Sequence, residues 1–302
     1  MKPKQLKETL RGCMKAKLPV LLKGAPGIGK CLGKGTPILM YDGTIKDVEN
    51  IIKGDRIMGP DSKPRQVQST TKGKGELYWV IPKKGLVYIV NKYHVLSLRM
   101  SPVRIGRKSR TIEISVGEYL KTSTTFKHHA KEWRTGVDFA EQGILLDPYL
   151  LGLWLGDGDR RRPCFTNIDP EIIDWLIIHG RKLHLPAKFY KTSNTAKHIA
   201  LTGKRGGGRS SRGQNTIQNS LEYYGLVKAK HVPHVYKANS REVRLQVLAG
   251  LIDTDGSLAS NCYEIVQKSR RLSDDIVFLA RSLGLAAYLK KTKKTCTNTG
   301  AV

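Results

Sequence analysis

The sequence predicts a mixed fold, in which an all-β module is followed by an α+β part. Between roughly residues 31 and 140, short β-rich runs alternate with turns of Gly, Pro and Lys, a pattern typical of β-hairpins. From Asp147 onward, amphipathic helical segments alternate with short strands. The order of elements in this second part occurs twice, which predicts two related halves.

The composition favours a soluble protein with a polyanionic partner. The chain has 302 residues, enough for two domains, and 39% of them are hydrophobic. Its 53 basic and 25 acidic residues give a net charge of +28, which points most often to nucleic acid. A soluble surface rich in lysine is the alternative interpretation of the same charge.

Several classes of protein are disfavoured. We find no run of about 18 apolar residues, the length that a membrane-spanning helix needs. The basic N-terminus has an apolar run of about five residues, too short for a signal peptide, so we expect a cytoplasmic protein with no membrane partner. Five cysteines without a C-x-x-C pair argue against zinc sites and disulfide frameworks, but leave a reactive thiol open.

The first 30 residues resemble the start of a nucleotide-binding domain. Residues 19–24 predict a buried strand that runs into a glycine-rich loop, in which Gly24, Gly29 and Lys30 satisfy the phosphate-binding pattern G-x-x-x-x-G-K. The next residue should be Ser or Thr, which holds Mg²⁺, but the chain has Cys31 there. A P-loop ATPase would continue with a long helix, whereas strands and turns follow here.

The β-module begins with a hairpin. Residues 36–51, TPILMYDGTIKDVENI, carry Asp-Gly between two apolar runs, which is a strong hairpin signal. Residues 53–98 continue with short β-rich runs separated by Gly, Pro and Lys turns. The sequence therefore predicts an all-β module rather than an ATPase core.

The second part begins at Asp147 with a predicted apolar helix. The elements expected in its first half are a helix over 147–159, a helix over 170–185, paired strands over 187–193 and 197–204, a basic loop over 203–213 and a helix over 215–226.

This pattern then returns. LLGLWLGDG at 150–158 is followed 98 residues later by LAGLIDTDG at 248–256. After each comes a strand, then an amphipathic helix, then a basic strand, the last of these being AAYLKKT at 286–292 in the second copy. Four elements in the same order indicate an internal repeat.

The two repeated helices predict a metal site. Gly152 and Gly250 occupy matching positions and would let the backbones approach closely. Both helices end at Asp-Gly, so Asp157 and Asp255 would meet at one end of the pair. Carboxylates placed together repel unless a divalent cation lies between them, and Mg²⁺ prefers such oxygen ligands. A capped helix end with a solvated Asp is the alternative for either motif alone.

These motifs resemble the LAGLIDADG, or dodecapeptide (DOD-type), family of homing endonucleases, which LAGLIDTDG matches at eight of nine positions. The resemblance implies pseudo-symmetric αββαββα halves whose sheets form a saddle over double-stranded DNA. It also implies that Asp157 and Asp255 bind Mg²⁺, with backbone carbonyls from Gly156 and Thr254. The first copy has Leu155 where the second has an acid, so that position is not the required ligand.

A lysine block lies before the second motif. KHVPHVY at 230–236 resembles the family's K-x-(I/V)-P block, which implies a catalytic role for Lys230 as a charge stabiliser or water-orienting group. Read alone, one lysine among 53 basic residues is usually only solvated. A second catalytic lysine has no counterpart that we can place. The segments 107–134 and 203–213 are candidates for contact with DNA, or ordinary solvated loops.

The segment that begins at Cys31 is similar to the N-terminal block of inteins, with the Hint (hedgehog/intein) fold. The matching residues are Cys31, Gly33, Thr36, Gly43, Lys46, Gly54 and Asp55. The resemblance implies that the Cys31 thiol attacks the carbonyl of Lys30, a role suited to a thiol. In NKYH at 91–94, Asn91 would bond the scissile region and His94 would protonate the departing nitrogen. Alone, a histidine on a strand is more often a packed or surface residue.

The broken P-loop then has an explanation. It belongs to a host resembling AAA/MoxR-like ATPases, in which Gly24, Gly29 and Lys30 bind ATP and Mg²⁺ only after splicing. The missing Ser or Thr would be the first residue after the intein. We find no His-Asn intein terminus before Val302, so we expect a C-terminally truncated chain in which splicing is incomplete.

The sequence thus predicts protein self-splicing, beginning with an N-to-S acyl shift, together with Mg²⁺-dependent cleavage of double-stranded DNA by a monomeric endonuclease. The predicted domains are a host flank over 1–30, the N-terminal part of the Hint domain over 31–145 with a possible DNA-contacting insert over 105–135, a first repeat over 146–240, and a truncated second repeat over 241–302. The alternatives are a P-loop ATPase fragment, for which we see no Walker B strand, and a catalytically inactive basic DNA-binding protein.

Overall fold

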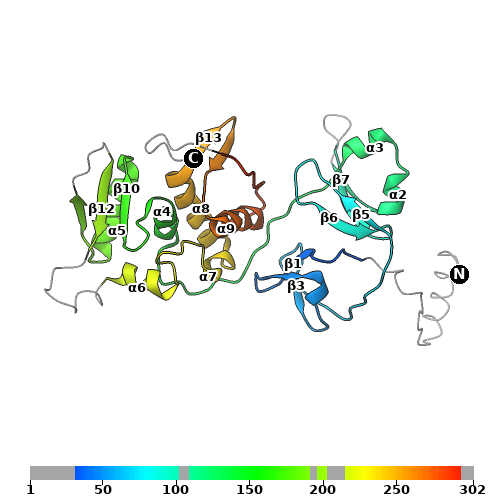
Figure 1. Ribbon diagram of the computed structural model, residues 1–302, viewed down its shortest axis with the longest axis horizontal. Coiled ribbons are helices and arrows are strands. Elements are labelled where there is room, and N and C mark those ends of the chain that lie inside the picture. Colours follow the sequence, from blue (N-terminus) through cyan, green and yellow to red (C-terminus); the bar gives the residue numbers. More distant parts are fainter. Residues whose placement is uncertain (1–30, 102–108, 191–195, 203–214, 294–302) are drawn as a thin grey trace. The chain divides into compact units, whose positions relative to one another are not determined.

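The computed structural model describes residues 31–101, 109–190, 196–202 and 215–293 (Figure 1). The predicted strand of the host flank, its P-loop and the basic loop over 203–213 lie outside these residues. The described residues form two compact units. The first comprises residues up to Thr36 together with 69–132, and the second comprises 37–68 together with 133 onward. Each unit is described by itself.

The first unit is built on antiparallel strands. Its strands are β5 (Leu77–Val80), β6 (Tyr88–Asn91), β7 (Val95–Met100), β8 (Arg110–Ser115) and β9 (Ala130–Lys131). β5 pairs with β6, and a second sheet has the order β8–β7–β9. Val90, Leu96 and Leu98 form its buried core together with Val116 and Ala130.

The prediction of an all-β module is wrong at one place. Two short helices, α2 (Val116–Leu120) and α3 (Thr124–His129), follow β8. Local capping explains both of them. The Ser115 hydroxyl accepts a hydrogen bond from the Glu118 backbone N–H while the Glu118 carboxylate accepts one from the Ser115 N–H, and the Ser123 hydroxyl caps α3. This capping box is a sequence signal for a helix start inside a β-rich region.

The second unit begins with small hairpins. They contain β1 (Pro37–Leu39), β2 (Ile45–Asp47), the 3₁₀ turn η1 (Val48–Asn50), β3 (Arg56–Met58) and β4 (Pro64–Gln66). β1 pairs with β2 in the predicted Asp-Gly hairpin. The Asp42 carboxylate accepts hydrogen bonds from the N–H and the hydroxyl of Thr44, at 2.9 and 2.7 Å. Gly43 has a φ of +83°, a conformation that glycine adopts without strain.

The helical region follows the predicted order in its first half. It contains α4 (Pro148–Asp157), β10 (Cys164–Asn167), α5 (Pro170–Lys182), β11 (Ala187–Tyr190), β12 (Lys197–Leu201) and α6 (Thr216–Tyr223). The sheet has the order β10–β12–β11. Asp147 and Asp169 accept hydrogen bonds from the first turns of α4 and α5, each of which starts with proline.

The second half starts after a short connecting helix. Its elements are α7 (His234–Lys237), α8 (Arg241–Asp255), β13 (Gly256–Ala259), β14 (Cys262–Ile265) and α9 (Arg270–Ser282). β13 and β14 form a hairpin. Mixed strand and helix content is thereby confirmed for the chain.

The basic strand expected over 286–292 is not formed among the described residues. In the first half, β11 joins its sheet only through β12, which pairs with both β11 and β10. The described residues of the second half supply no strand equivalent to β12, so among them this segment has no neighbouring strand with which to form a ladder.

α4 and α8 lie side by side at the centre of the helical region (Figure 1). A Cβ atom built on Gly152 would lie 2.9 Å from the Cα of Gly250, and the reverse distance is also 2.9 Å. The helices therefore touch backbone to backbone, as the matching glycines predict. Buried side chains surround the contact, among them Leu150, Leu153, Trp154, Val247 and Leu251.

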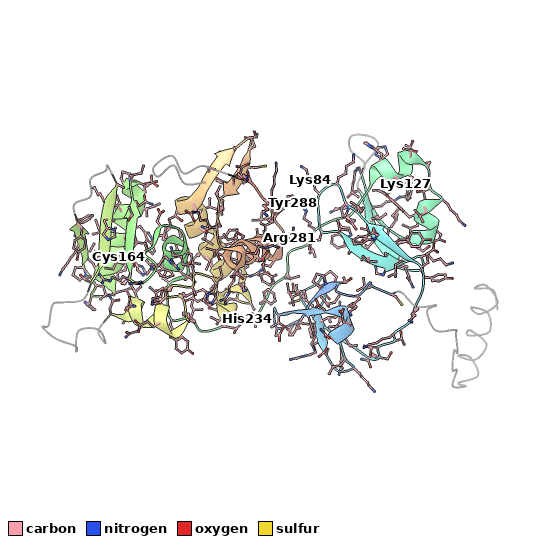
Figure 2. The ribbon with its side chains drawn as sticks, in the orientation of Figure 1. Lys84, Lys127, Cys164, His234, Arg281 and Tyr288 are labelled. Carbon is pink, nitrogen blue, oxygen red and sulfur yellow. The ribbon has the colours of Figure 1, made fainter. Side chains whose placement is uncertain are left out.

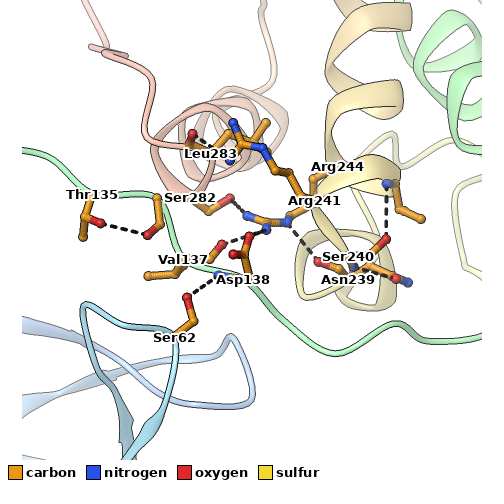
Figure 3. A network of polar contacts seen from close by, with 12 residues as sticks. Ser62, Thr135, Val137, Asp138, Asn239, Ser240, Arg241, Arg244, Ser282 and Leu283 are labelled. Carbon is orange, nitrogen blue, oxygen red and sulfur yellow. Dashed lines mark hydrogen bonds and ion pairs between the residues drawn. The ribbon is translucent and has the colours of Figure 1, made fainter.

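A buried arginine fixes the segment that enters the helical region (Figure 3). Arg244 on α8 is fully buried and donates to the Val137 carbonyl at 2.7 Å, the Ser282 hydroxyl at 2.7 Å and the Asn239 carbonyl at 2.9 Å. The Asp138 carboxylate lies 3.6 Å away. Three hydrogen bonds and a nearby charge satisfy the guanidinium, which would otherwise be costly to bury.

The glycine contact yields a stability prediction. Gly250→Ala would place a methyl group 2.5 Å from the Tyr149 carbonyl oxygen and 2.7 Å from the Leu153 nitrogen, both backbone atoms that cannot move independently. We expect the free energy of unfolding in urea to fall by about 3 kcal/mol.

The matched control is Gly143→Ala, because a Cβ there meets nothing within 4 Å. We expect that change to stay within about 0.5 kcal/mol of the wild type. Equal stability of the two variants would contradict the close helix contact.

Candidate functional site

Asp157 and Asp255 end the two glycine-packed helices, α4 and α8. Gly158 and Gly256 follow them as C-caps in extended conformation. A Cβ atom on Gly156 would lie 3.4 Å from the carboxyl carbon of Asp255, so the two carboxyl groups occupy the same end of the helix pair. The structure therefore brings together the two acids that the repeated motifs single out.

The two carboxyl groups are partly buried, and the charge on Asp255 acts on Asp157. Burial raises the pKa of Asp157 to about 6, and the charge on Asp255 adds to the increase, while a hydrogen bond from Asn167 and the charge of Lys230 oppose it. Burial also raises the pKa of Asp255, against the effects of Lys230 and Gln267. Acids held in this way ionise at a cost that a bound cation would offset.

Lys230 lies against the end of α4. Its ammonium donates to the Gly158 carbonyl at 2.7 Å and to the Gly156 carbonyl at 3.1 Å, which brackets Asp157. The ammonium also lies over the Trp154 ring, 5.1 Å from its centroid. Burial lowers the pKa of Lys230 to about 8, although the charges of Asp255 and Asp157 raise it. The structure thus places the predicted lysine in the site.

A buried carboxylate holds the segment that carries Lys230. Asp275 on α9 accepts a hydrogen bond from the Val232 N–H at 2.9 Å and forms an ion pair with Lys237. The side chain of Asp275 is almost fully buried. Residues 230–233 have no regular secondary structure, so this carboxylate supplies a partner for a backbone N–H that no helix or strand would satisfy.

Two amide side chains in the site were missed by sequence reasoning. Asn167, at the end of β10, donates to the Asp157 carboxylate at 2.6 Å, and Gln267, just after β14, donates to the Asp255 carboxylate. The Asn167 oxygen in turn accepts from the Asp169 N–H at 2.7 Å, which fixes the orientation of the amide. The signal was available, because an amide residue stands at the end of β10 and another just after β14, at similar distances from the two Asp-Gly pairs.

The donor set fits a hard divalent cation. It offers two carboxylates and the backbone carbonyl of Gly156, and oxygen ligands of this kind suit Mg²⁺. The Thr254 hydroxyl is turned toward its own helix and donates to the Gly250 carbonyl at 2.8 Å, so only its backbone could serve. Among the described residues, no group of three or more His, Cys, Asp or Glu side chains gathers to hold a metal.

The residues predicted for splicing meet in the first unit. The Cys31 N–H donates to the Asn91 side-chain oxygen at 3.4 Å, and the Asn91 N–H donates to the Cys31 carbonyl at 3.1 Å. The His94 N–H donates to the Asn91 carbonyl at 3.1 Å, so the histidine belongs to the turn that follows β6. Asn91 is buried, which fixes its amide beside Cys31.

The residues of the host flank cannot be placed. Gly24, Gly29 and Lys30 lie outside the described residues, as does the carbonyl of the Lys30–Cys31 peptide. Their roles stay predictions. No helix in the described part of the chain is long and apolar enough to cross a membrane.

Comparison with known proteins finds two family matches along the chain. Residues 31–136 match the family model of the homing-endonuclease-associated Hint domain, and residues 231–301 match the family model of homing endonucleases. The two matches define the class of protein, a Hint domain joined to a homing endonuclease. The chain is an intein with a homing endonuclease.

Curated relatives are similar over larger stretches. A replicative DNA helicase DnaB of Mycobacterium intracellulare is 26% identical over 290 residues, covering 88% of this chain and 44% of the relative. The catalytic polypeptide of a V-type proton ATPase from Candida tropicalis is 28% identical over 55% of this chain and 16% of the relative. A homothallic switching endonuclease of Saccharomyces cerevisiae is 27% identical over 46% of this chain and 27% of the relative. The chain spans less than half the length of each of these relatives.

The buried acid pair yields a prediction about the metal-free protein. Because burial raises the pKa of Asp157 to about 6, the native state favours the protonated form, and stability is lost as the pH rises through 6. Asp157→Asn removes that cost, so at pH 7.5 in EDTA we expect the free energy of unfolding to rise by about 1 kcal/mol, discounted for partial exposure.

The gain should vanish below about pH 4, where the wild-type carboxyl is protonated as well. Asp174→Asn, an exposed change on α5, is the control and should alter stability at neither pH. Urea unfolding at pH 7.5 and pH 4 measures both variants. A loss of stability in Asp157→Asn at pH 7.5 would contradict the electrostatic account of the site.

Proposed function

We propose that the helical region is an endonuclease of the LAGLIDADG type that cleaves double-stranded DNA with Mg²⁺ held between Asp157 and Asp255. One observation carries the proposal: the two acids end two helices that touch at matching glycines, with the Lys230 ammonium on the adjoining carbonyls. The net charge of +28 suits a nucleic acid substrate.

The protein groups have distinct parts in this chemistry. Asp157 and Asp255 would hold the cation, with the backbone carbonyls of Gly156 and Thr254 as further candidate ligands. When bound, Mg²⁺ supplies Lewis-acid stabilisation of charge at phosphorus and a lowered pKa for bound water. Lys230 places a positive charge beside the acids, where it can stabilise a developing oxyanion.

Asn167 and Gln267 act on the acids and not on the substrate. Each amide donates to one carboxylate oxygen, which leaves the other oxygen of that carboxylate for a cation. Groups that orient metal ligands in this way typically change activity by about 10–100-fold when removed.

We further propose that the first unit performs the opening step of protein splicing. The Cys31 sulfur attacks the Lys30 carbonyl carbon, a C–S bond forms, the C–N bond of the Lys30–Cys31 peptide breaks, and the thiol proton leaves to solvent. The departing nitrogen becomes the amino group of Cys31 by taking a proton from His94. Asn91 supports this assignment because its side chain already accepts from that nitrogen at 3.4 Å.

The host and the DNA target follow from the broken P-loop. We propose that the flank over 1–30 belongs to a AAA/MoxR-like ATPase, in which Gly24, Gly29 and Lys30 bind ATP with Mg²⁺ only after splicing. The target would be the uninterrupted host gene around the P-loop codons, cut by a monomeric, cytoplasmic enzyme. Similar chains carry the names of a helicase, an endonuclease and a proton ATPase.

The cleavage proposal is tested on a duplex spanning the uninterrupted P-loop codons. Asp157→Asn and Asp255→Asn should each lower the rate of Mg²⁺-dependent cleavage by at least about 100-fold, because each removes a carboxylate from the cation site. Binding of the same duplex, measured without metal, should persist.

The matched control is Asp253→Asn. This exposed carboxylate lies on α8, as Asp255 does, but it accepts a hydrogen bond from the Tyr149 hydroxyl and is not part of the proposed cation site. The control variant should cleave at the wild-type rate. Cleavage by Asp157→Asn at the wild-type rate would leave only the alternative of a DNA-binding protein whose acids have no catalytic role.

The splicing proposal is tested with a thiol. Dithiothreitol should release a peptide that ends at Lys30, because it intercepts the thioester, and mass spectrometry identifies the product. Cys31→Ala should abolish the release, whereas His94→Ala should slow it, since the departing nitrogen then lacks its acid. Release that persists in Cys31→Ala would overturn the assignment of the nucleophile.

A further inference from the structure

A turn rich in arginine follows α4 directly. Residues 159–162 read Asp-Arg-Arg-Arg and connect the end of the helix, two residues after Asp157, to β10. All four side chains are exposed. The mechanism proposed above does not use them.

The backbone of this turn is held from several directions. The Trp154 indole donates to the Arg162 carbonyl at 2.8 Å, and the Gln218 amide donates to the Arg161 carbonyl at 3.2 Å. The Asp159 carboxylate accepts from the Arg161 N–H at 2.8 Å. The arginine side chains therefore project from a preorganised support, which lowers the entropy lost when they bind a ligand.

Lys228 completes the arrangement. Its N–H donates to the Arg160 carbonyl at 2.7 Å, and the Arg160 guanidinium donates back to the Lys228 carbonyl at 3.2 Å. Lys228 has a φ of +66°, a left-handed conformation that costs energy for a residue with a Cβ. Strained residues of this kind are retained where the surroundings hold them, often at binding sites.

These groups line an open cavity of about 460 Å³. The lining comes from residues 159–162, Cys164, His198 and Lys228. Cys164, labelled in Figure 2, belongs to β10, and its thiol has a raised pKa owing mainly to burial. Among the described residues, no carboxylate forms an ion pair with the three arginines or with Lys228. Four cations against the single carboxylate of Asp159 leave a strongly positive cavity.

The corresponding turn of the second half differs in charge. Residues 257–261 read Ser-Leu-Ala-Ser-Asn; the first three belong to β13, and Ser260–Asn261 connect β13 to β14. Ser260 and Asn261 have positive φ values, which close a tight hairpin. Residues 257–261 after Asp255 therefore carry no cation, whereas residues 159–162 after Asp157 carry three.

We propose that the cavity formed by residues 159–162 and Lys228 binds backbone phosphates of duplex DNA. The first half of the endonuclease would then bind the DNA on its side of the cleavage site more strongly than the second half binds the DNA on the other side. Guanidinium groups match phosphate oxygens with paired hydrogen bonds, and the preorganised turn presents three of them beside the acid site. The proposal rests on DNA as the substrate, but not on cleavage.

The test is the salt dependence of DNA binding. A labelled duplex of about 30 base pairs and arbitrary sequence is titrated in EDTA at several KCl concentrations, with fluorescence anisotropy as the readout. The variant carrying Arg160→Gln, Arg161→Gln and Arg162→Gln should lower the slope of log Kd against log[KCl] by about 2 to 3, since each phosphate contact contributes about 0.9. Circular dichroism should show the wild-type fold.

Two controls separate a local site from general charge. Lys74→Gln, Lys83→Gln and Lys84→Gln remove the same charge from exposed positions in the first unit and should change the slope by less than about 1. Ser257→Ala with Asn261→Gly alters β13 and the turn of the second-half hairpin and should leave the slope unchanged. A triple arginine variant whose slope falls no further than either control would overturn the proposal.

Further variants keep the test decisive if the triple variant fails to fold. Lys228→Gly removes a cation and relieves the left-handed strain, so it should lower the slope by about 1 while stability is kept or raised. Arg161→Lys should keep the slope but weaken binding several-fold, because an ammonium cannot form the paired contact. A wild-type slope in Lys228→Gly would count against the cavity.

Failure here is distinguishable from failure of the nuclease assignment. Asp157→Asn should bind the duplex with the wild-type slope, whatever its effect on cleavage. A lowered slope in the arginine variant together with cleavage by Asp157→Asn would sustain the phosphate site and overturn the catalytic assignment.

Discussion

The backbone contact between α4 and α8 is the constraint on which the cleavage site depends. Gly152 and Gly250 face each other with no side chain between them, so the helix ends converge and carry Asp157 and Asp255 into one place. A side chain at either glycine would push the helices apart, and two isolated carboxylates would then be ordinary solvated acids. Glycine is a weak helix former, and its use at the centre of two helices costs intrinsic helix stability. This loss of helix stability accompanies the close approach of the two backbones, which a side chain at either glycine would prevent.

At the site that results from this contact, ionisation of the two acids is unfavourable, and neighbouring side chains offset part of the cost. Burial disfavours both ionised acids and the charge of Asp255 further disfavours ionised Asp157, while Lys230, Asn167 and Gln267 compensate in part. Lys230 comes from an irregular segment, which depends on the buried carboxylate of Asp275 for its own hydrogen bonds. These hydrogen bonds and the charge of Lys230 allow the two acids to stay close together without a cation. The remaining cost lowers the stability of the fold, as is common at functional sites.

The two halves of the helical region share an element order but not a surface. In the first half β10, β12 and β11 form a sheet, and the preceding turn is basic and held by Trp154 and Gln218. In the described part of the second half the hairpin β13–β14 has an uncharged turn. Two repeats with the same packing but different surfaces can bind a partner that lacks two-fold symmetry, because each half then presents different side chains to it. Arg244 ties the entering segment to α8 and α9 and so fixes the frame in which both halves are held.

The sequence alone determined much of this protein, because repeat spacing, capping residues and turn residues are local signals. LLGLWLGDG and LAGLIDTDG predicted the paired helices and their acids, Asp-Gly at 42–43 predicted the first hairpin, and the block from Cys31 indicated the intein class. The helices after β8 were missed although their capping box is local. The strand expected over 286–292 does not form among the described residues, since a strand needs a partner there, which is a non-local condition. Only the tertiary structure decided that Asn167 and Gln267 reach the acids, that Asp275 holds the segment of Lys230, and that Lys228 meets the arginine turn. Those contacts join residues from about ten to nearly seventy positions apart, and no spacing rule in a single sequence specifies which side chains the folded chain brings together.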